Sequence, residues 1–190
     1  DGMIACSTAA GPAFEGAQIH MGLGGVDGAI NTVNINHEVR YTTIGDKPAR
    51  GICGSGIVDA AAMMLKAGII DVMGRMLTSD EAKEQLPAAI SEKVIDYEGS
   101  PALLLARSDE GAERDVVITQ KDIREVQLAK GAIAAGVEIL TNEASIEMED
   151  IKAVYLAGGF GNYIDHGHAC DIMLIPTALR EKIIPIGNGA

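Results

Sequence analysis

The sequence predicts an α/β protein, because helical and strand patterns alternate along a chain of 190 residues. Residues 120–140 carry apolar and small side chains at three- and four-residue spacing, which is typical of a packed helix. Residues 151–157 read as a buried strand that runs directly into the glycines at 158–161. Neither an internal repeat nor a linker interrupts the chain, so we expect a single domain over residues 1–190.

The N-terminal part predicts a strand, a helix and a hairpin, in that order. Residues 3–6 read as a short strand, and a loop at 7–11 leads to a helix that begins at Pro12. Apolar and polar residues then alternate over 29–36 and again over 38–44. Two such adjacent patterns predict a β-hairpin.

The middle of the chain predicts two further helices and two strands. A glycine-rich loop at 51–56 leads into an alanine-rich helix at 57–66, and residues 78–85 form a short surface helix capped by Thr78 or Ser79. Strands are expected at 103–106 and 116–119, joined by a polar turn. The long helix over 120–140 follows, with Thr119 as N-cap and Asp122 in its first turn.

Composition excludes several classes of protein. The chain has 15 Lys and Arg against 27 Asp and Glu, a net charge of −12, which disfavours a nucleic-acid partner. No apolar run approaches the roughly 20 residues of a membrane span. Three widely spaced cysteines, Cys6, Cys53 and Cys170, do not form a disulfide framework. We therefore expect a cytoplasmic globular protein without a membrane or nucleic-acid partner.

The glycines at 158–161 form the strongest local motif. At the end of a strand, residues without side chains let the backbone approach a ligand, which suits a nucleotide pocket. A tight turn that needs positive φ explains the same glycines equally well. The spacing is not the Gly-x-Gly-x-x-Gly fingerprint, and the chain has no phosphate-binding Gly-x-x-x-x-Gly-Lys-Ser/Thr loop.

Two other motifs invite chemistry and have simpler explanations. Cys53 lies in a glycine-rich loop like a nucleophile, but Ser55 stands where a nucleophile elbow needs Gly. We favour a small buried thiol, while the N–H groups of that loop remain candidates for touching a phosphate. The candidate metal ligands are His166, His168 and Cys170, with Asp165 alongside. No Cys-x-x-Cys pair accompanies them, so the solvated start of a helix explains these residues better. We therefore predict no metal site.

Five strings, in order, resemble a known family. They are residues 5–17, 51–56, 118–123, 127–133 and 156–165. Together they resemble the C-terminal ATPase region of the reductive activators of corrinoid proteins, a family whose members are often called ferredoxins or metal-binding proteins.

The resemblance implies an actin/hexokinase/Hsp70-like (ASKHA) fold, in which ribonuclease-H-like lobes, each a mixed sheet flanked by helices, surround a nucleotide cleft. This chain would be the adenosine-side lobe of an actin-like ATPase, truncated at both ends. By this resemblance, the glycine turn at 158–161 would approach the adenine and ribose. The turn of small residues at 7–11 would approach the phosphates or the ribose. The implied binding residues are Gly158, Gly159, Phe160, Gly161, Ser7, Thr8, Ala10, Gly11 and Glu15. No residue here is implied to be catalytic.

The implied reaction uses ATP with Mg²⁺ to support the return of an inactive Co(II) corrinoid protein of a methyl-transfer system to Co(I). The electron would come from an upstream iron–sulfur domain of the same chain, since three scattered cysteines cannot hold a cluster here. The family's two Asp-x-Gly-Thr phosphate loops are missing from these residues, so we expect the lobe alone to be inactive and to need the other lobe for ATP. The alternative is a non-catalytic docking module for a corrinoid protein. The oligomeric state, including a homodimer, stays open.

Overall fold

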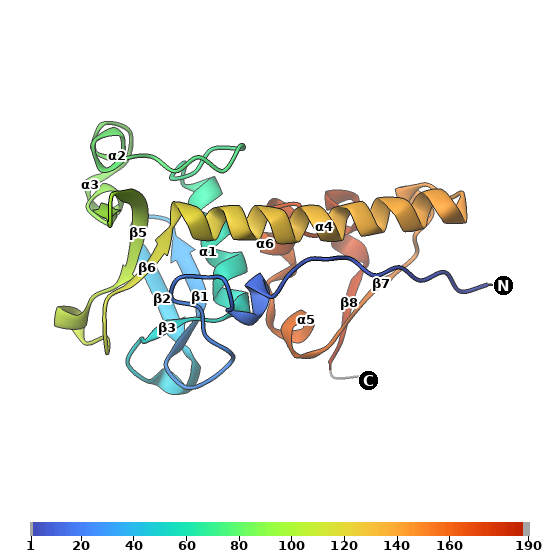
Figure 1. Cartoon of the computed structure of the whole chain (residues 1–190), viewed down its shortest axis with the longest axis horizontal. Coiled ribbons are helices and arrows are strands. Elements are labelled where there is room, and N and C mark those ends of the chain that lie inside the picture. Colours follow the sequence, from blue (N-terminus) through green and yellow to red (C-terminus); the bar gives the residue numbers. More distant parts are fainter. Residues whose placement is uncertain (1, 188–190) are drawn as a thin grey trace.

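A long helix lies beside two groups of strands, one toward each of its ends (Figure 1). The computed structural model describes residues 2–187. Helix α4 (Gln120–Ala144) runs along most of the long axis, with β1 to β6 toward its N-terminal end and β7 and β8 near its C-terminal half (Figure 1). Helix and strand segments thus alternate as the α/β prediction requires.

The predicted hairpin is present and belongs to a mixed sheet. Strand β1 (Ala29–Ile35) pairs antiparallel with β2 (Val39–Thr43) and parallel with β3 (Gly51–Ile52). The side chains of β1 alternate between the core and solvent along most of its length, as the sequence pattern indicated. A one-turn helix, η2 (Ile44–Asp46), follows β2.

Helix α1 (Gly54–Lys66) begins three residues earlier than predicted. Gly54 and Gly56, which were expected to lie in a loop, are already helical, and Cys53 is the extended N-cap residue. A Cβ at Gly56 would lie 2.3 Å from the carbonyl oxygen of Ile30. The prediction of a loop at 51–56 was therefore wrong. Residues 51–52 form β3, and Gly56 allows α1 to pack closely on β1.

A second sheet lies beside the first. It has the order β4 (Val94–Tyr97), β5 (Ser100–Ala106), β6 (Val116–Thr119), and all its pairs are antiparallel. The predicted strands β5 and β6 are confirmed. Strand β4 and the short helix α3 (Ala88–Ser91) were not predicted. A one-turn helix, η3 (Ser108–Glu110), lies in the predicted polar turn.

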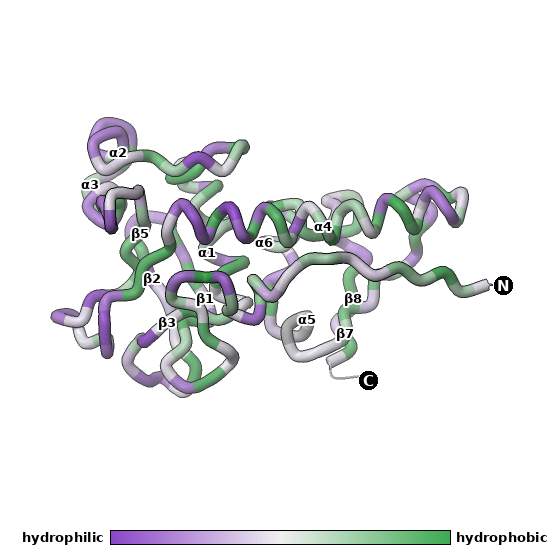
Figure 2. The backbone as a smooth tube through the Cα atoms, viewed as in Figure 1, coloured by the Kyte–Doolittle hydropathy of each residue, from purple (hydrophilic) through white to green (hydrophobic). Residues whose placement is uncertain are grey.

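Both helices with predicted threonine caps are confirmed. Helix α2 (Ser79–Gln85) has a complete capping box between Thr78 and Glu81, and its mostly hydrophilic residues are drawn in purple in Figure 2. Helix α4 has the same arrangement between Thr119 and Asp122. It continues four residues beyond the predicted end and stops at Ser145, which adopts a left-handed conformation.

The C-terminal part differs from the prediction of a buried strand at 151–157. After η4 (Met148–Asp150), strand β7 (Val154–Ala157) begins late and alternates between half-buried and exposed positions, with Tyr155 63% exposed. Within the described chain its partner is β8 (Ile183–Gly187), in a parallel pair. Since a parallel sheet is normally covered on both faces, the uncovered face explains the exposure.

Three short helices connect β7 to β8. They are α5 (Gly159–Tyr163), α6 (His166–Asp171) and η5 (Thr177–Lys182). The chain is therefore helical directly after Gly158, and α5 is separated from α6 at Asp165, whose side chain caps α6.

The N-terminal predictions of a strand at 3–6 and a helix from Pro12 were wrong. Residues 2–11 run in extended form below α4 without a strand partner in the described chain (Figure 1), and Met3 is 95% exposed. A strand needs a neighbour for its backbone groups, and apolar alternation alone does not supply one. Only one helical turn, η1 (Ala13–Glu15), forms after Pro12.

Candidate functional site

A cavity of about 720 Å³ opens between segments that are far apart in the sequence. The β1–β2 hairpin contributes Thr32 and Thr43, the start of α1 contributes Ser55, η1 contributes Glu15, and α5 contributes Gly159. The volume lies within the range of about 300–1,000 Å³ that is usual for small-molecule sites. The cavity therefore brings together residues from three of the five strings that carry the family resemblance, 5–17, 51–56 and 156–165.

The N-terminus of α1 lies in the wall of this cavity. Cys53, Gly54 and Ser55 line it, and the first N–H groups of a helix have no partner within the helix. No acidic side chain occupies the first turn of α1. The positive end of the helix dipole is therefore not neutralised locally, and this wall of the cavity favours an anionic group.

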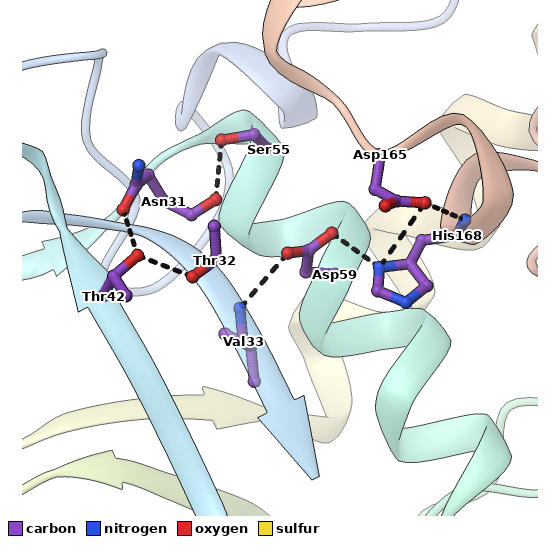
Figure 3. A network of polar contacts seen from close by, with 8 residues as sticks. All are labelled: Asn31, Thr32, Val33, Thr42, Ser55, Asp59, Asp165 and His168. Carbon is purple, nitrogen blue, oxygen red and sulfur yellow. Dashed lines mark hydrogen bonds and ion pairs between the residues drawn. The ribbon is translucent and has the colours of Figure 1, made fainter.

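Hydroxyl groups fix the orientation of Asn31, which also lines the cavity. The Thr42 hydroxyl donates to Asn31 Oδ1 at 2.9 Å, and the Thr32 and Thr42 hydroxyl oxygens lie 2.6 Å apart (Figure 3). Ser55 Oγ donates to the Asn31 carbonyl oxygen at 2.9 Å and so joins α1 to β1. Because Oδ1 is already an acceptor, the amide nitrogen of Asn31 is the end that can donate to a ligand.

The glycines that follow β7 serve different purposes. Gly158 has φ +93° and donates its N–H to the Gly187 carbonyl at 2.8 Å, so it forms the tight turn. A Cβ at Gly161 would lie 3.1 Å from Leu156 Cβ, so this glycine serves packing. Gly159 lines the cavity, and a Cβ there would meet no atom within 4 Å. The turn explanation thus holds for Gly158, whereas Gly159 lines the cavity with a bare backbone and its role in binding a ligand stays a prediction.

The predicted binding residues are distributed unevenly around this cavity. Glu15 and Gly159 line it, whereas Gly158 and Gly161 do not, and the Phe160 side chain lies outside the described part of the structure. The residues of the early turn are also absent from its lining; they are Ser7, Thr8, Ala10 and Gly11. Their roles stay predictions.

The early turn lies instead along α4. A Cβ at Gly136 would come within 2.3 Å of the Thr8 methyl group, and Cys6 Sγ donates to the Gly136 carbonyl oxygen at 3.6 Å. Because Gly136 has no side chain, Cys6 and Thr8 can pack directly against α4.

Sequence reasoning missed the hairpin side of the cavity. Asn31, Thr32, Thr43 and the glycines at 24 and 25 line it, yet the sequence analysis named none of them as a candidate site residue. The one available signal was the polar face of the hairpin, because exposed Asn and Thr in adjacent strands carry donors and acceptors.

The described residues give no support to a nucleophilic Cys53 or to a metal site at His166, His168 and Cys170. Cys53 is buried, and its Sγ lies 3.4 Å from both the Ile30 carbonyl oxygen and Ser55 Oγ, which fits the buried thiol that we favoured. Among residues 2–187 no group of three His, Cys, Asp or Glu side chains is arranged to hold a metal ion. His168 is instead paired with Asp59, and burial raises the pKa of the Cys170 thiol.

The described helices also bear on membranes. None within residues 2–187 combines the length and apolarity that a crossing requires.

Comparison with known proteins agrees with the fold. All 190 residues match the family described as the C-terminal domain of RACo, the ASKHA domain. The chain is 40% identical over 192 residues to the corrinoid activation enzyme RamQ of Eubacterium limosum, covering all of this chain and 32% of RamQ. It is 28% identical over 211 residues to the [Co(II) methylated amine-specific corrinoid protein] reductase of Methanosarcina barkeri, covering 99% of this chain and 34% of that protein.

A solved structure shows the same architecture. The reductive activator for corrinoid, iron–sulfur protein superposes with a TM-score of 0.83 at 36% identity, over 96% of this chain and 28% of that one. The chain spans about a third of the length of the curated relatives that it matches. The match of the whole chain places it in the RACo C-terminal family, as an ASKHA domain.

Proposed function

We propose that residues 1–190 form one lobe that supplies the adenosine-binding side of a nucleotide cleft in an ATP-dependent reductive activator. The complete protein would return an inactive Co(II) corrinoid protein to Co(I). The names of the relatives and of the matched structure support this reaction and this partner. The observation that carries the nucleotide assignment is the cavity in which the α1 N-terminus and the bare backbone of Gly159 face the same space.

The lining of the cavity fits a nucleotide. The α1 N-terminus at Gly54 and Ser55 would hold the phosphates, because unpaired N–H groups at the positive end of a helix bind anions. Gly159 would lie against the nucleoside, where the absence of a side chain permits close approach. When bound with Mg²⁺, ATP would supply the free energy that supports reduction of the corrinoid.

The carboxylates fit Mg²⁺ only in part. Glu15 is the acidic side chain that lines the cavity in the described chain. Mg²⁺ is usually held by one or two carboxylates together with phosphate oxygens and water. We therefore assign Glu15 as a candidate ligand, with the remaining positions filled by the nucleotide, by water and by the other lobe.

An iron–sulfur cluster does not fit these residues. Cys6 lies on the extended N-terminal segment, Cys53 caps α1, and Cys170 lies in α6, so the three thiols belong to separate elements. Such a cluster needs several thiolates around one point. The cluster and the electron it delivers are therefore assigned to another part of the protein.

The experiment compares Gly159→Asp with Gly131→Asp in the complete natural protein. Both positions accept a Cβ without contact, but Gly159 lines the cavity, whereas Gly131 lies exposed on α4. Calorimetry with Mg-ADP should show affinity weakened about tenfold or more by Gly159→Asp, through repulsion of the anionic ligand, and unchanged by Gly131→Asp. Equal affinities in both variants would contradict the assignment.

The docking alternative gives a different result. A docking module would retain a corrinoid protein without nucleotide, and neither substitution would alter corrinoid reduction. If Gly159→Asp lowers both nucleotide affinity and the rate of Co(II) reduction, while Gly131→Asp lowers neither, the enzymatic assignment stands.

A further inference from the structure

Asp59 is a buried carboxylate on the helix that forms one wall of the cavity. It lies one turn beyond Ser55 in α1 and is only 6% exposed. Its Oδ2 accepts the backbone N–H of Val33 in β1 at 3.2 Å, and its Oδ1 lies 2.8 Å from His168 Nδ1 in α6 (Figure 3). One side chain thus joins three elements.

His168 is held in place from a second side. Its backbone N–H donates to Asp165 Oδ1 at 2.8 Å, which caps α6. Asp165 and Ile164 are the two residues that separate α6 from α5, and α5 carries Gly159 and Tyr163 of the cavity wall. The Asp59–His168 contact therefore connects the glycine side of the cavity to the side formed by α1 and β1.

The charges around His168 favour its protonated form. The hydrogen bond to Asp59 is the largest cause that raises its pKa, and the charges of Asp59, Asp165 and Asp171 act in the same direction, while desolvation opposes them. A buried carboxylate is costly unless it is paired, so the imidazolium is the natural partner of Asp59.

The other elements packed on α6 also carry charges. Arg180 of η5 is ion-paired with Asp171 and lies beside Gly167, and Lys130 of α4 donates to the Ile172 carbonyl oxygen at 2.9 Å. On α1 and β1, the groups that face the imidazole are the Asp59 carboxylate and, through it, the neutral Val33 amide.

We propose that His168 is a positioning residue for the nucleotide site: its hydrogen bond to Asp59 holds the α5–α6 segment against α1 and β1, and so fixes Gly159 opposite the α1 N-terminus. This inference rests on the proposed function. It assigns a role to a histidine that neither touches the cavity nor belongs to a metal site.

The proposal predicts a pH dependence with a defined sign. Because the pKa of His168 is raised in the folded protein, the charged pair is complete at low pH and is lost as pH rises through the folded pKa. Nucleotide affinity should therefore fall with rising pH to the extent that it depends on this pair.

The experiment measures Mg-ADP affinity of the complete protein from pH 5.5 to pH 9 in three variants. His168→Asn keeps a neutral donor near the position of Nδ1, His168→Ala removes the contact, and His166→Asn is the matched control on the same helix. Dividing each affinity by the wild-type value at the same pH cancels the titration of the nucleotide itself.

At the acidic end, His168→Ala should weaken affinity about tenfold and His168→Asn less, because the neutral hydrogen bond remains. At the alkaline end the His168→Asn ratio should approach one, because the wild-type imidazole is then neutral too. The His168→Ala variant should still bind more weakly than wild type there, since it lacks even the neutral hydrogen bond to Asp59. His166→Asn should stay near one throughout. Ratios for His168→Asn and His168→Ala that do not change with pH, or that equal the His166→Asn ratio, would overturn the proposal.

Hydrogen exchange separates this proposal from the proposed function. In His168→Asn without nucleotide, the backbone amides of residues 158–171 should exchange faster than in His166→Asn at the same pH. If the wild-type protein binds no nucleotide at any pH, the proposed function fails. Independently of that result, an exchange rate of residues 158–171 that is the same in His168→Asn and His166→Asn would overturn the positioning role of His168.

Discussion

The backbone N–H of His20 donates to Asp122 Oδ1 at 2.7 Å, and this bond ties the loop after η1 to the first turn of α4. Asp122 is 1% exposed, and its other oxygen accepts both the N–H and the hydroxyl of Thr119 at 2.8 Å. The carboxylate that closes the capping box is therefore also a tertiary link to the segment that delivers Glu15 to the cavity.

Asp122→Ala should destabilise the protein by about 2–4 kcal/mol, because it removes a helix cap and leaves the His20 and Thr119 donors without their acceptor. Thr78→Ala is the comparison, since it weakens an exposed capping box and should lower stability by only about 0.5–1 kcal/mol. Denaturant unfolding of both variants measures the difference, and equal losses would contradict the tertiary role of Asp122.

Gly56→Ala should destabilise by about 2 kcal/mol or more, although alanine is the better helix former. The added methyl group would meet the Ile30 carbonyl oxygen at 2.3 Å and push α1 away from β1. Gly131→Ala, where a Cβ meets nothing within 4 Å, should stabilise by up to about 1 kcal/mol. Thermal unfolding should shift in opposite directions; a shift of the same sign in both would refute close packing at Gly56.

The cysteines should react with iodoacetamide in a fixed order. Cys6 is exposed, whereas Cys170 is buried and its pKa is raised by burial, so alkylation of Cys170 should be slower by about tenfold or more. Cys53 is buried but lines the cavity, and bound Mg-ADP should slow its reaction further. Mass spectrometry of timed samples gives the rates, and protection of Cys6 by nucleotide in place of Cys53 would count against the site.

His168 should also make stability depend on pH. Its folded pKa is raised above the ordinary value of 6.5, so its stabilising contribution is complete below that value and disappears as pH rises through the folded pKa. The difference in unfolding free energy between wild type and His168→Asn should therefore shrink from pH 5.5 to pH 9. A difference that grows over this range would show that Asp59 does not hold the imidazolium.

Features fixed by nearby residues were predictable from the sequence. Thr119 and Asp122 stand three residues apart, and Thr78 and Glu81 repeat that spacing, so both helix starts were found to within a residue. Strand β7 was misjudged, because its apolar run has the composition of a strand covered on both faces while the described chain covers one. Burial depends on what packs against a segment, which periodicity does not report.

In the candidate site, too, features that depend on residues distant in the sequence could not be predicted. Gly159 and Glu15 were identified from family resemblance and lie in the cavity, but the partnership of Asp59 with His168 joins residues 109 positions apart. No local pattern connects them, because one lies in α1 and the other in α6. Asn31 was missed for a related reason, because its orientation is set by Thr42 on the neighbouring strand.

Strand β6 ends at Thr119 and α4 begins at Gln120, so no loop intervenes between sheet and helix. A loop would let the two rotate independently, whereas the buried Thr119–Asp122 cap makes the junction stiff. With 25 residues rising about 1.5 Å each, α4 is nearly 40 Å long. A small tilt of the β4–β5–β6 sheet would therefore tilt α4 as well, and the displacement would be larger at the C-terminal end of α4, beside β7 and β8.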